Sequence, residues 1–60
     1  MNVIVHYRIT RDRAGFPQDF SAARRFVANE DEVIEEMAKF SLAADYQVPL
    51  SAVQIRSIEH

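Results

Sequence analysis

Only a few residues of this chain belong to types that do chemistry, and their spacing does not assemble a site. The two histidines are His6, in a segment of alternating apolar and polar residues, and His60, the last residue. Neither has a second ligand at a metal-binding spacing, and the absence of cysteine removes thiolate zinc sites. We therefore expect no metal, and surface positions for both histidines.

Nucleophilic and phosphate-binding patterns are equally sparse. None of the four serines lies in a sequence resembling the strained turn that exposes a catalytic serine. Five acids crowd into residues 30–36, where carboxylates commonly stabilise the N-terminal end of a helix. The single glycine cannot build a phosphate-cradling loop. With no nucleophile, base and orienting group in view, we expect a non-enzymatic protein without a cofactor.

Length and composition indicate one small α+β domain spanning residues 1–60. The hydrophobic fraction is 48% and the charged fraction 27%, which is ordinary for a folded domain. We expect neither a membrane span nor a secretory leader, and a chain without cysteine fits the cytoplasm. A domain this short usually needs a staple, so a protein partner or a homodimer is expected.

The net charge of −2 conceals two halves of opposite sign. Residues 1–28 carry five arginines against two aspartates, a net charge of +3. Residues 29–60 carry one lysine and one arginine against seven acids, a net charge of −5. Halves of opposite charge can face different partners, or each other across a dimer.

Residue patterns predict two strands in the first half. Residues 2–10 are rich in β-branched and aromatic residues and alternate between two faces, of which one belongs to the core. Gly15 and Pro17 mark a turn over residues 11–18. Residues 19–28 are expected to form a second strand, with a bulge at Arg24 and Arg25 that turns both charges outward. A short helix is the alternative there, because residues 21–25 are good helix formers.

The second half predicts a helix and a third strand. Asn29 and Glu32 form a capping pattern, and Pro49 ends the helix by Val48. Helical spacing predicts one buried stripe on this helix. Residues 50–59 form the last strand, with Ile58 on the face of Gln54 and Arg56. The full predicted core contains Val3, Val5, Tyr7, Ile9, Phe26, Val33, Met37, Phe40, Ala44, Val53 and Ile55.

The element order β-β-α-β predicts a three-stranded antiparallel or mixed sheet with strand order 2-1-3. A right-handed crossover places the first strand in the middle, and the single helix covers one face of the sheet. Two surfaces then remain for a partner. The open sheet face carries Arg8, Arg24, Arg25 and Arg56, and the outer side of the helix carries Leu42 and Tyr46, which lie one turn apart.

Parts of the second half resemble the small inhibitors of host RNA polymerase made by some podophages. The resembling segments are residues 29–32, Val48-Pro49 and residues 53–56, and they are spread over a region of about half of the chain. The family has the same order of elements and uses arginines of its last strand against the polymerase. Arg56 is the matching position, whereas Ser57 and Ile58 depart from the pattern. The resemblance implies a class: small phage or mobile-element proteins that occupy a host protein.

The expected function is therefore that of a protein-binding module, an inhibitor or regulator that occupies a bacterial host protein. The alternative is a small dimeric regulator that binds nucleic acid through the arginines of the sheet. An acidic net charge and a single lysine favour the protein partner, because non-specific phosphate binding needs a broad positive field.

Overall fold

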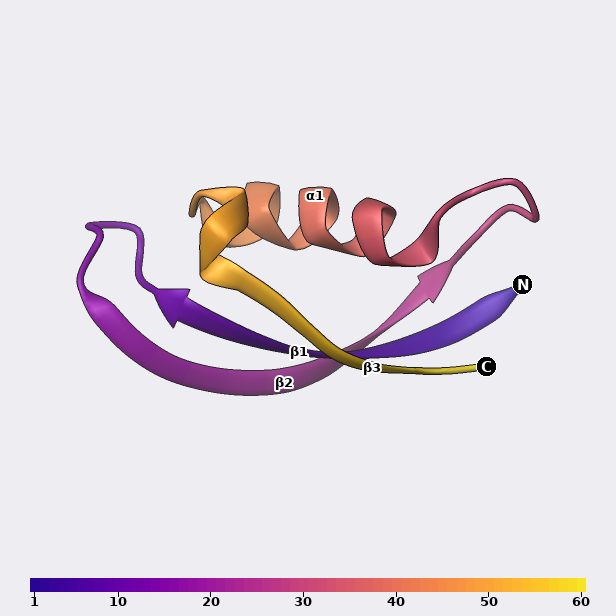
Figure 1. Ribbon diagram of the computed structural model, residues 1–60, viewed down its shortest axis with the longest axis horizontal. Coiled ribbons are helices and arrows are strands. Elements are labelled where there is room, and N and C mark those ends of the chain that lie inside the picture. The colour runs from indigo at the N-terminus through magenta and orange to yellow at the C-terminus, as the bar shows by residue number, and fades with distance from the viewer.

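Three strands and one helix form two layers in the computed structural model (Figure 1). The strands are β1 (Asn2–Arg11), β2 (Pro17–Val27) and β3 (Val53–Glu59), and the helix is α1 (Ile34–Tyr46). A short 3-10 turn, η1 (Leu50–Ala52), leads into β3. The sheet is antiparallel throughout, with order β2-β1-β3 and α1 on one face. The predicted α+β fold and strand order are confirmed.

The central strand β1 alternates as its sequence predicts. Its side chains on the face covered by α1 are all buried: Val3, Val5, Tyr7 and Ile9. The side chains between them are half-buried on the open face. β1 pairs with β2 along most of its length and with β3 from Ile4 to Ile9, so its alternation sets the register of the whole sheet.

The segment 19–28 is a strand, so the helical alternative is wrong. β2 pairs with β1 without a break from Phe20 to Val27, and the predicted bulge at Arg24 and Arg25 is absent. The strand needs no bulge because Arg24 is accommodated on the helix side, where it pairs with Asp45. Arg24 and Arg25 therefore point to opposite faces of the sheet.

A bulge occurs instead in β3, where the sequence gives no sign of it. His6 lies opposite Ser57 and Tyr7 opposite Ile55, so Arg56 is the extra residue. The extra residue reverses the alternation of the last part of β3. Ile58 consequently lies opposite Val5 and packs into the core, which corrects the prediction that it shares the open face with Gln54 and Arg56.

The helix presents a different face to the sheet from the one predicted. Its buried residues are Ala38, Leu42 and Ala43, with Ile34 and Tyr46 half-buried. Small alanines allow α1 to lie close to the large side chains of β1, and dense packing favours that fit. Val33 and Phe40 remain 61% and 63% exposed, and Ala44 is exposed as well. The core assignment of these three residues was wrong, and Met37 is only half-buried.

The helix also begins later than its capping pattern suggests. Asn29 and Glu32 do interact, since the Asn29 backbone amide donates to Glu32 Oε1 at 2.8 Å, but they close a turn ahead of the helix. The first helical residue is Ile34, and Val33 provides no side-chain cap. The prediction that the helix ends by Val48 is confirmed, because α1 stops at Tyr46.

The C-terminal end of α1 is a Schellman motif with an uncommon residue at its left-handed position. Gln47 has φ 56°. Its backbone amide donates to the carbonyl oxygen of Ala44, and the backbone amide of Val48 donates to that of Ala43. A residue with a Cβ is strained there, and glycine is the usual choice. The buried Val48 side chain packs in the same cluster as Ala43 and holds the motif in place.

The two sides of α1 predict contrasting costs of truncation. Leu42→Ala removes a fully buried side chain and should lower the free energy of unfolding by about 2–5 kcal/mol. Phe40→Ala removes an exposed side chain, and we expect a change within about 0.5 kcal/mol. Urea denaturation followed by circular dichroism measures both. A similar decrease in the free energy of unfolding for the two variants would show that Phe40, and not only Leu42, packs in the core.

Gln47→Gly should stabilise the protein by up to about 1 kcal/mol, because glycine relieves the left-handed strain. Gln47→Ala is the matched control, since it removes the same side-chain contacts but keeps a Cβ. Thermal unfolding of the two variants gives the comparison. A glycine variant less stable than the alanine variant would contradict the strain at this position.

Candidate functional site

The structure separates the residues that the sequence grouped as partner-binding. Arg8, Arg25 and Arg56 belong to the open sheet face, whereas Arg24 lies on the opposite side beneath α1. Arg8 donates from Nε to Asp19 at 2.8 Å, and this ion pair neutralises its charge locally. The predicted basic face is therefore reduced to two arginines without a carboxylate partner, Arg25 and Arg56.

The other two predicted partner-binding residues face the sheet. Leu42 has no exposed surface and Tyr46 is half-buried, so the pair does not form an outer anchor as predicted. Tyr46 joins an aromatic cluster instead, with ring centroids 6.0 Å from Tyr7 and 5.8 Å from Phe20. The guanidinium of Arg24 lies 5.8 Å from the centre of the Tyr46 ring and pairs with Asp45.

Two tyrosine hydroxyls meet inside this cluster. The hydroxyl oxygens of Tyr7 and Tyr46 lie 2.7 Å apart, and either can donate. Burial raises the pKa of Tyr7 to about 12, and the hydrogen bond with Tyr46 adds to the rise, whereas Arg24 opposes it. For Arg24, burial lowers the guanidinium pKa but the hydrogen bond to Asp45 and the neighbouring tyrosines outweigh it, so the net direction is upward. These groups join β1, β2 and the end of α1.

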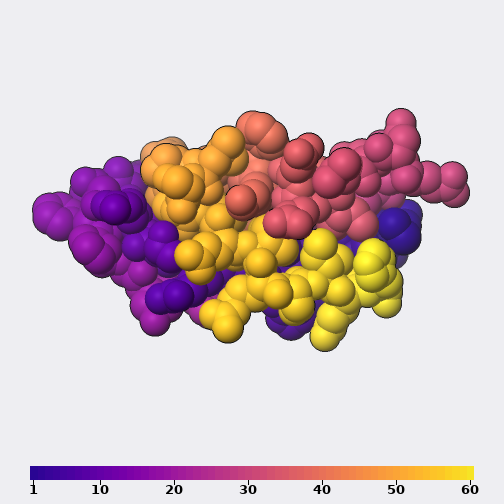
Figure 2. Space-filling model, in the orientation of Figure 1, coloured from indigo at the N-terminus to yellow at the C-terminus, as the bar shows by residue number.

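One surface of interest is the outer ridge of α1, which we define as Val33, Met37, Phe40 and Ala44. These residues follow one another at helical spacing and so form a single stripe. No element lies over the outer side of α1, and in the space-filling view its residues form the middle of the upper margin of the molecule (Figures 1 and 2). The sequence revealed this stripe, but it was assigned to the core.

The charges beside the outer ridge are mostly negative. The exposed acids near the start of α1 are Glu30, Asp31, Glu35 and Glu36. Only one basic residue, Lys39, lies on the helix, and it is half-buried. The outer ridge is therefore an apolar stripe with an acidic margin.

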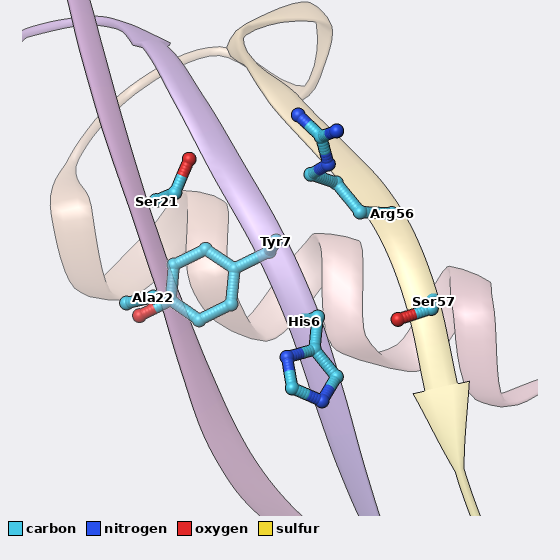
Figure 3. Close-up of a pocket in the computed structure, with 6 residues that line it drawn as sticks. All are labelled: His6, Tyr7, Ser21, Ala22, Arg56 and Ser57. Carbon is cyan, nitrogen blue, oxygen red and sulfur yellow. The ribbon is translucent and has the colours of Figure 1, made fainter.

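The other surface is a shallow hollow of about 440 Å³ on the open side of the sheet. It is built from two residues on each strand (Figure 3), and we call it the sheet hollow: His6, Tyr7, Ser21, Ala22, Arg56 and Ser57. The side chains of Tyr7 and Ala22 face α1, so these two residues form the floor of the hollow. Ser57 was not singled out from the sequence, because the bulge that aligns it with His6 could not be foreseen.

Comparison with known proteins and a search for other chemical groups add no further assignment. No match is found among protein-family models, curated proteins or solved structures. No three side chains of His, Asp or Glu gather closely enough to hold a metal ion. The only helix longer than one turn, α1, is too short and too polar to cross a membrane. Function must therefore be inferred from the geometry of the outer ridge and the sheet hollow.

The tyrosine pair predicts a loss of stability in alkali. An unfolded tyrosine ionises near pH about 10, and Tyr7 holds its proton to about pH 12 in the folded protein. The contribution of the Tyr7 hydroxyl to the free energy of unfolding is therefore fully present below about pH 10 and is lost as the pH rises through about 12. Over this range the free energy of unfolding falls by up to about 1.4 kcal/mol per pH unit. Urea denaturation at about pH 9, 10 and 11 should show a steeper fall for the wild type than for Tyr7→Phe. Equal slopes would contradict a protonated, buried Tyr7 hydroxyl.

Proposed function

We propose that this protein is a non-enzymatic protein-binding module whose contact surface is the outer ridge of α1. The observation that carries the proposal is an apolar helical stripe in which Val33, Phe40 and Ala44 are exposed and Met37 is half-buried. Val33 and Phe40 are 61% and 63% exposed, although the same helix buries a second apolar face against the sheet. A helix with two apolar faces has one more than its own fold needs.

The spacing of the outer ridge supports a helix-in-groove contact. Anchors at i, i+4, i+7 and i+11 are the pattern with which an amphipathic helix lays one face into an apolar groove of a partner. Aromatic residues dominate such contacts, so Phe40, near the middle of the stripe, is the expected anchor. The sheet holds α1 in its helical form beforehand, which lowers the entropy cost of binding.

The acids beside the ridge specify the chemistry of the partner. Glu35 and Glu36 are exposed in the first turn of α1, with Glu30 and Asp31 just before it. A groove with a basic rim complements them, whereas an acidic rim is repelled. We propose a target protein with an apolar groove and a lysine- or arginine-rich margin. Two copies meeting through their acidic helix starts are disfavoured for the same reason.

Occupation of a groove is how a small chain without catalytic groups acts as an inhibitor or regulator. A phage or mobile-element protein that occupies a bacterial host protein remains the proposed class, on the strength of the sequence resemblance. The alternative nucleic-acid regulator has less support, because Arg8 and Arg24 are paired with carboxylates and Arg24 lies off the open face. Binding to nucleic acid is kept as an outcome of the test.

Phe40→Ser and Phe16→Ser form a matched pair that tests the proposal. Both remove an exposed phenylalanine, 63% and 67% exposed, but Phe16 lies in the β1–β2 turn and Phe40 on α1. A target captured from source cells by the immobilised wild type is purified, and its affinity is measured for each variant. We expect Phe40→Ser to weaken binding about 30-fold or more and Phe16→Ser by about twofold or less.

A crosslinking experiment separates the alternatives. A photo-reactive phenylalanine analogue at position 40 should crosslink the target, and the same analogue at position 16 should not. Crosslinks between two copies through position 40 would replace the foreign partner with a homodimer. Equal binding of the target by both serine variants, or submicromolar binding of DNA or RNA by the wild type near physiological salt, would overturn the ridge as the contact surface.

A further inference from the structure

The two edges of the sheet differ in how well they are protected against a further strand. The edge strand β3 has seven residues and a bulge at Arg56, and both short length and bulges blunt an edge. The other edge strand, β2, has eleven residues and pairs with β1 without a break from Phe20 to Val27 (Figure 3). Its only proline is its first residue, where it interferes least with pairing. The outward backbone groups of β2 are therefore a template for another strand.

The sequence of β2 is self-complementary about its midpoint, Ala22. When two copies of a strand pair antiparallel around a two-fold axis perpendicular to the sheet, residues equally far from the axis lie opposite each other on the same face. Asp19 and Arg25 lie three residues before and after Ala22. An axis at Ala22 therefore sets each aspartate against the arginine of the other copy, which gives two ion pairs by symmetry. Ser21 and Ala23, which also meet, are small and uncharged.

Neighbouring registers lack this match. With the axis at Ser21, Asp19 lies opposite Ala23 of the second copy. With the axis at Ala23, it lies opposite Val27. An axis at Arg24 sets that residue against its own copy, and like charges directly opposite each other are destabilising. Cross-strand charge pairing therefore favours the register centred on the midpoint of the strand.

The groups that this pairing uses are available in the single chain. Arg25 is exposed and has no carboxylate partner. Asp19 is exposed and accepts from Arg8 at Oδ1, so its Oδ2 can accept from a second guanidinium. On the helix side of β2, Phe20 is 43% exposed, because α1 lies nearer to β3 than to β2. The pairing sets the Phe20 ring opposite Arg24 of the second copy, whose stem and guanidinium can cover it.

From these observations we propose that two copies of this chain pair antiparallel through β2, in the register centred on Ala22, and join their sheets into one. Both helices then lie on the same face of the joined sheet, because the two-fold axis is perpendicular to it. The second copy supplies the added burial that a chain of 60 residues without cysteine needs. The pairing groups all belong to β2, so the proposal stands independently of the outer ridge.

Sedimentation equilibrium of the full chain over a range of concentrations tests for the dimer. We expect a monomer–dimer equilibrium with a dissociation constant of about 100 μM or tighter. Arg25→Glu replaces both ion pairs with pairs of like charges and should weaken the dimer about tenfold or more. Arg56→Glu makes the same charge change on β3, at the opposite edge of the sheet, and should weaken the dimer about twofold or less.

Introduced cysteines test the register, since the chain has none of its own. Ser21 and Ala23 are exposed on β2 and lie opposite each other in the proposed dimer. An equal mixture of Ser21→Cys and Ala23→Cys should therefore form disulfide-linked dimers under mild oxidation faster than either variant alone. Circular dichroism of each variant checks that the fold is retained.

Three results would overturn the β2 dimer. The first is a folded wild type that sediments as a monomer up to about 1 mM. The second is an equal effect of Arg25→Glu and Arg56→Glu on the dissociation constant, which would place the contact elsewhere or reduce it to net charge. The third is crosslinking of either cysteine variant alone as fast as that of the mixture, which would contradict an axis at Ala22.

Discussion

The contact between Tyr7 and Tyr46 ties the middle of the sheet to the last turn of the helix, and much of the surface follows from it. A buried tyrosine hydroxyl needs a partner, and for Tyr7 that partner is the hydroxyl of Tyr46 at 2.7 Å. With Tyr46 turned toward the sheet, Leu42 and Ala38, one and two turns earlier, must face it too. The opposite stripe, which includes Phe40, is then left outside.

This constraint explains why the strands were more predictable than the helix. The alternation of β1 has one solution, since only Val3, Val5, Tyr7 and Ile9 form an uninterrupted apolar face, and all four are buried. Helix α1 has two apolar stripes, and periodicity alone does not say which is buried. The stripe that contains Phe40 was chosen, but the fold favours the one whose alanines fit against β1 and whose tyrosine reaches Tyr7.

The candidate site was less predictable than the fold for a related reason. A bulge moves the residues that follow it to the other face of the sheet, and no residue pattern in 53–59 predicts the bulge in β3. Arg56 was correctly placed on the open face, but Ser57 and Ile58 exchanged roles: the serine lines the hollow and the isoleucine joins the core. Arg24 was misplaced because an ion pair with Asp45, far away in sequence, makes a helix-facing arginine tolerable.

The small size of the protein connects these surfaces to its stability. The buried residues fall into two clusters, one around Tyr7 and Leu42 and a smaller one around Val3, Val5 and Ala38. The smaller cluster lies under the first part of α1, where Val33 offers no side-chain cap. This end of the helix depends most on added contacts, and the outer ridge begins there. A partner bound on the ridge would bury Val33 and stabilise the folded state by mass action, although the exposed ridge residues add little to the stability of the free protein.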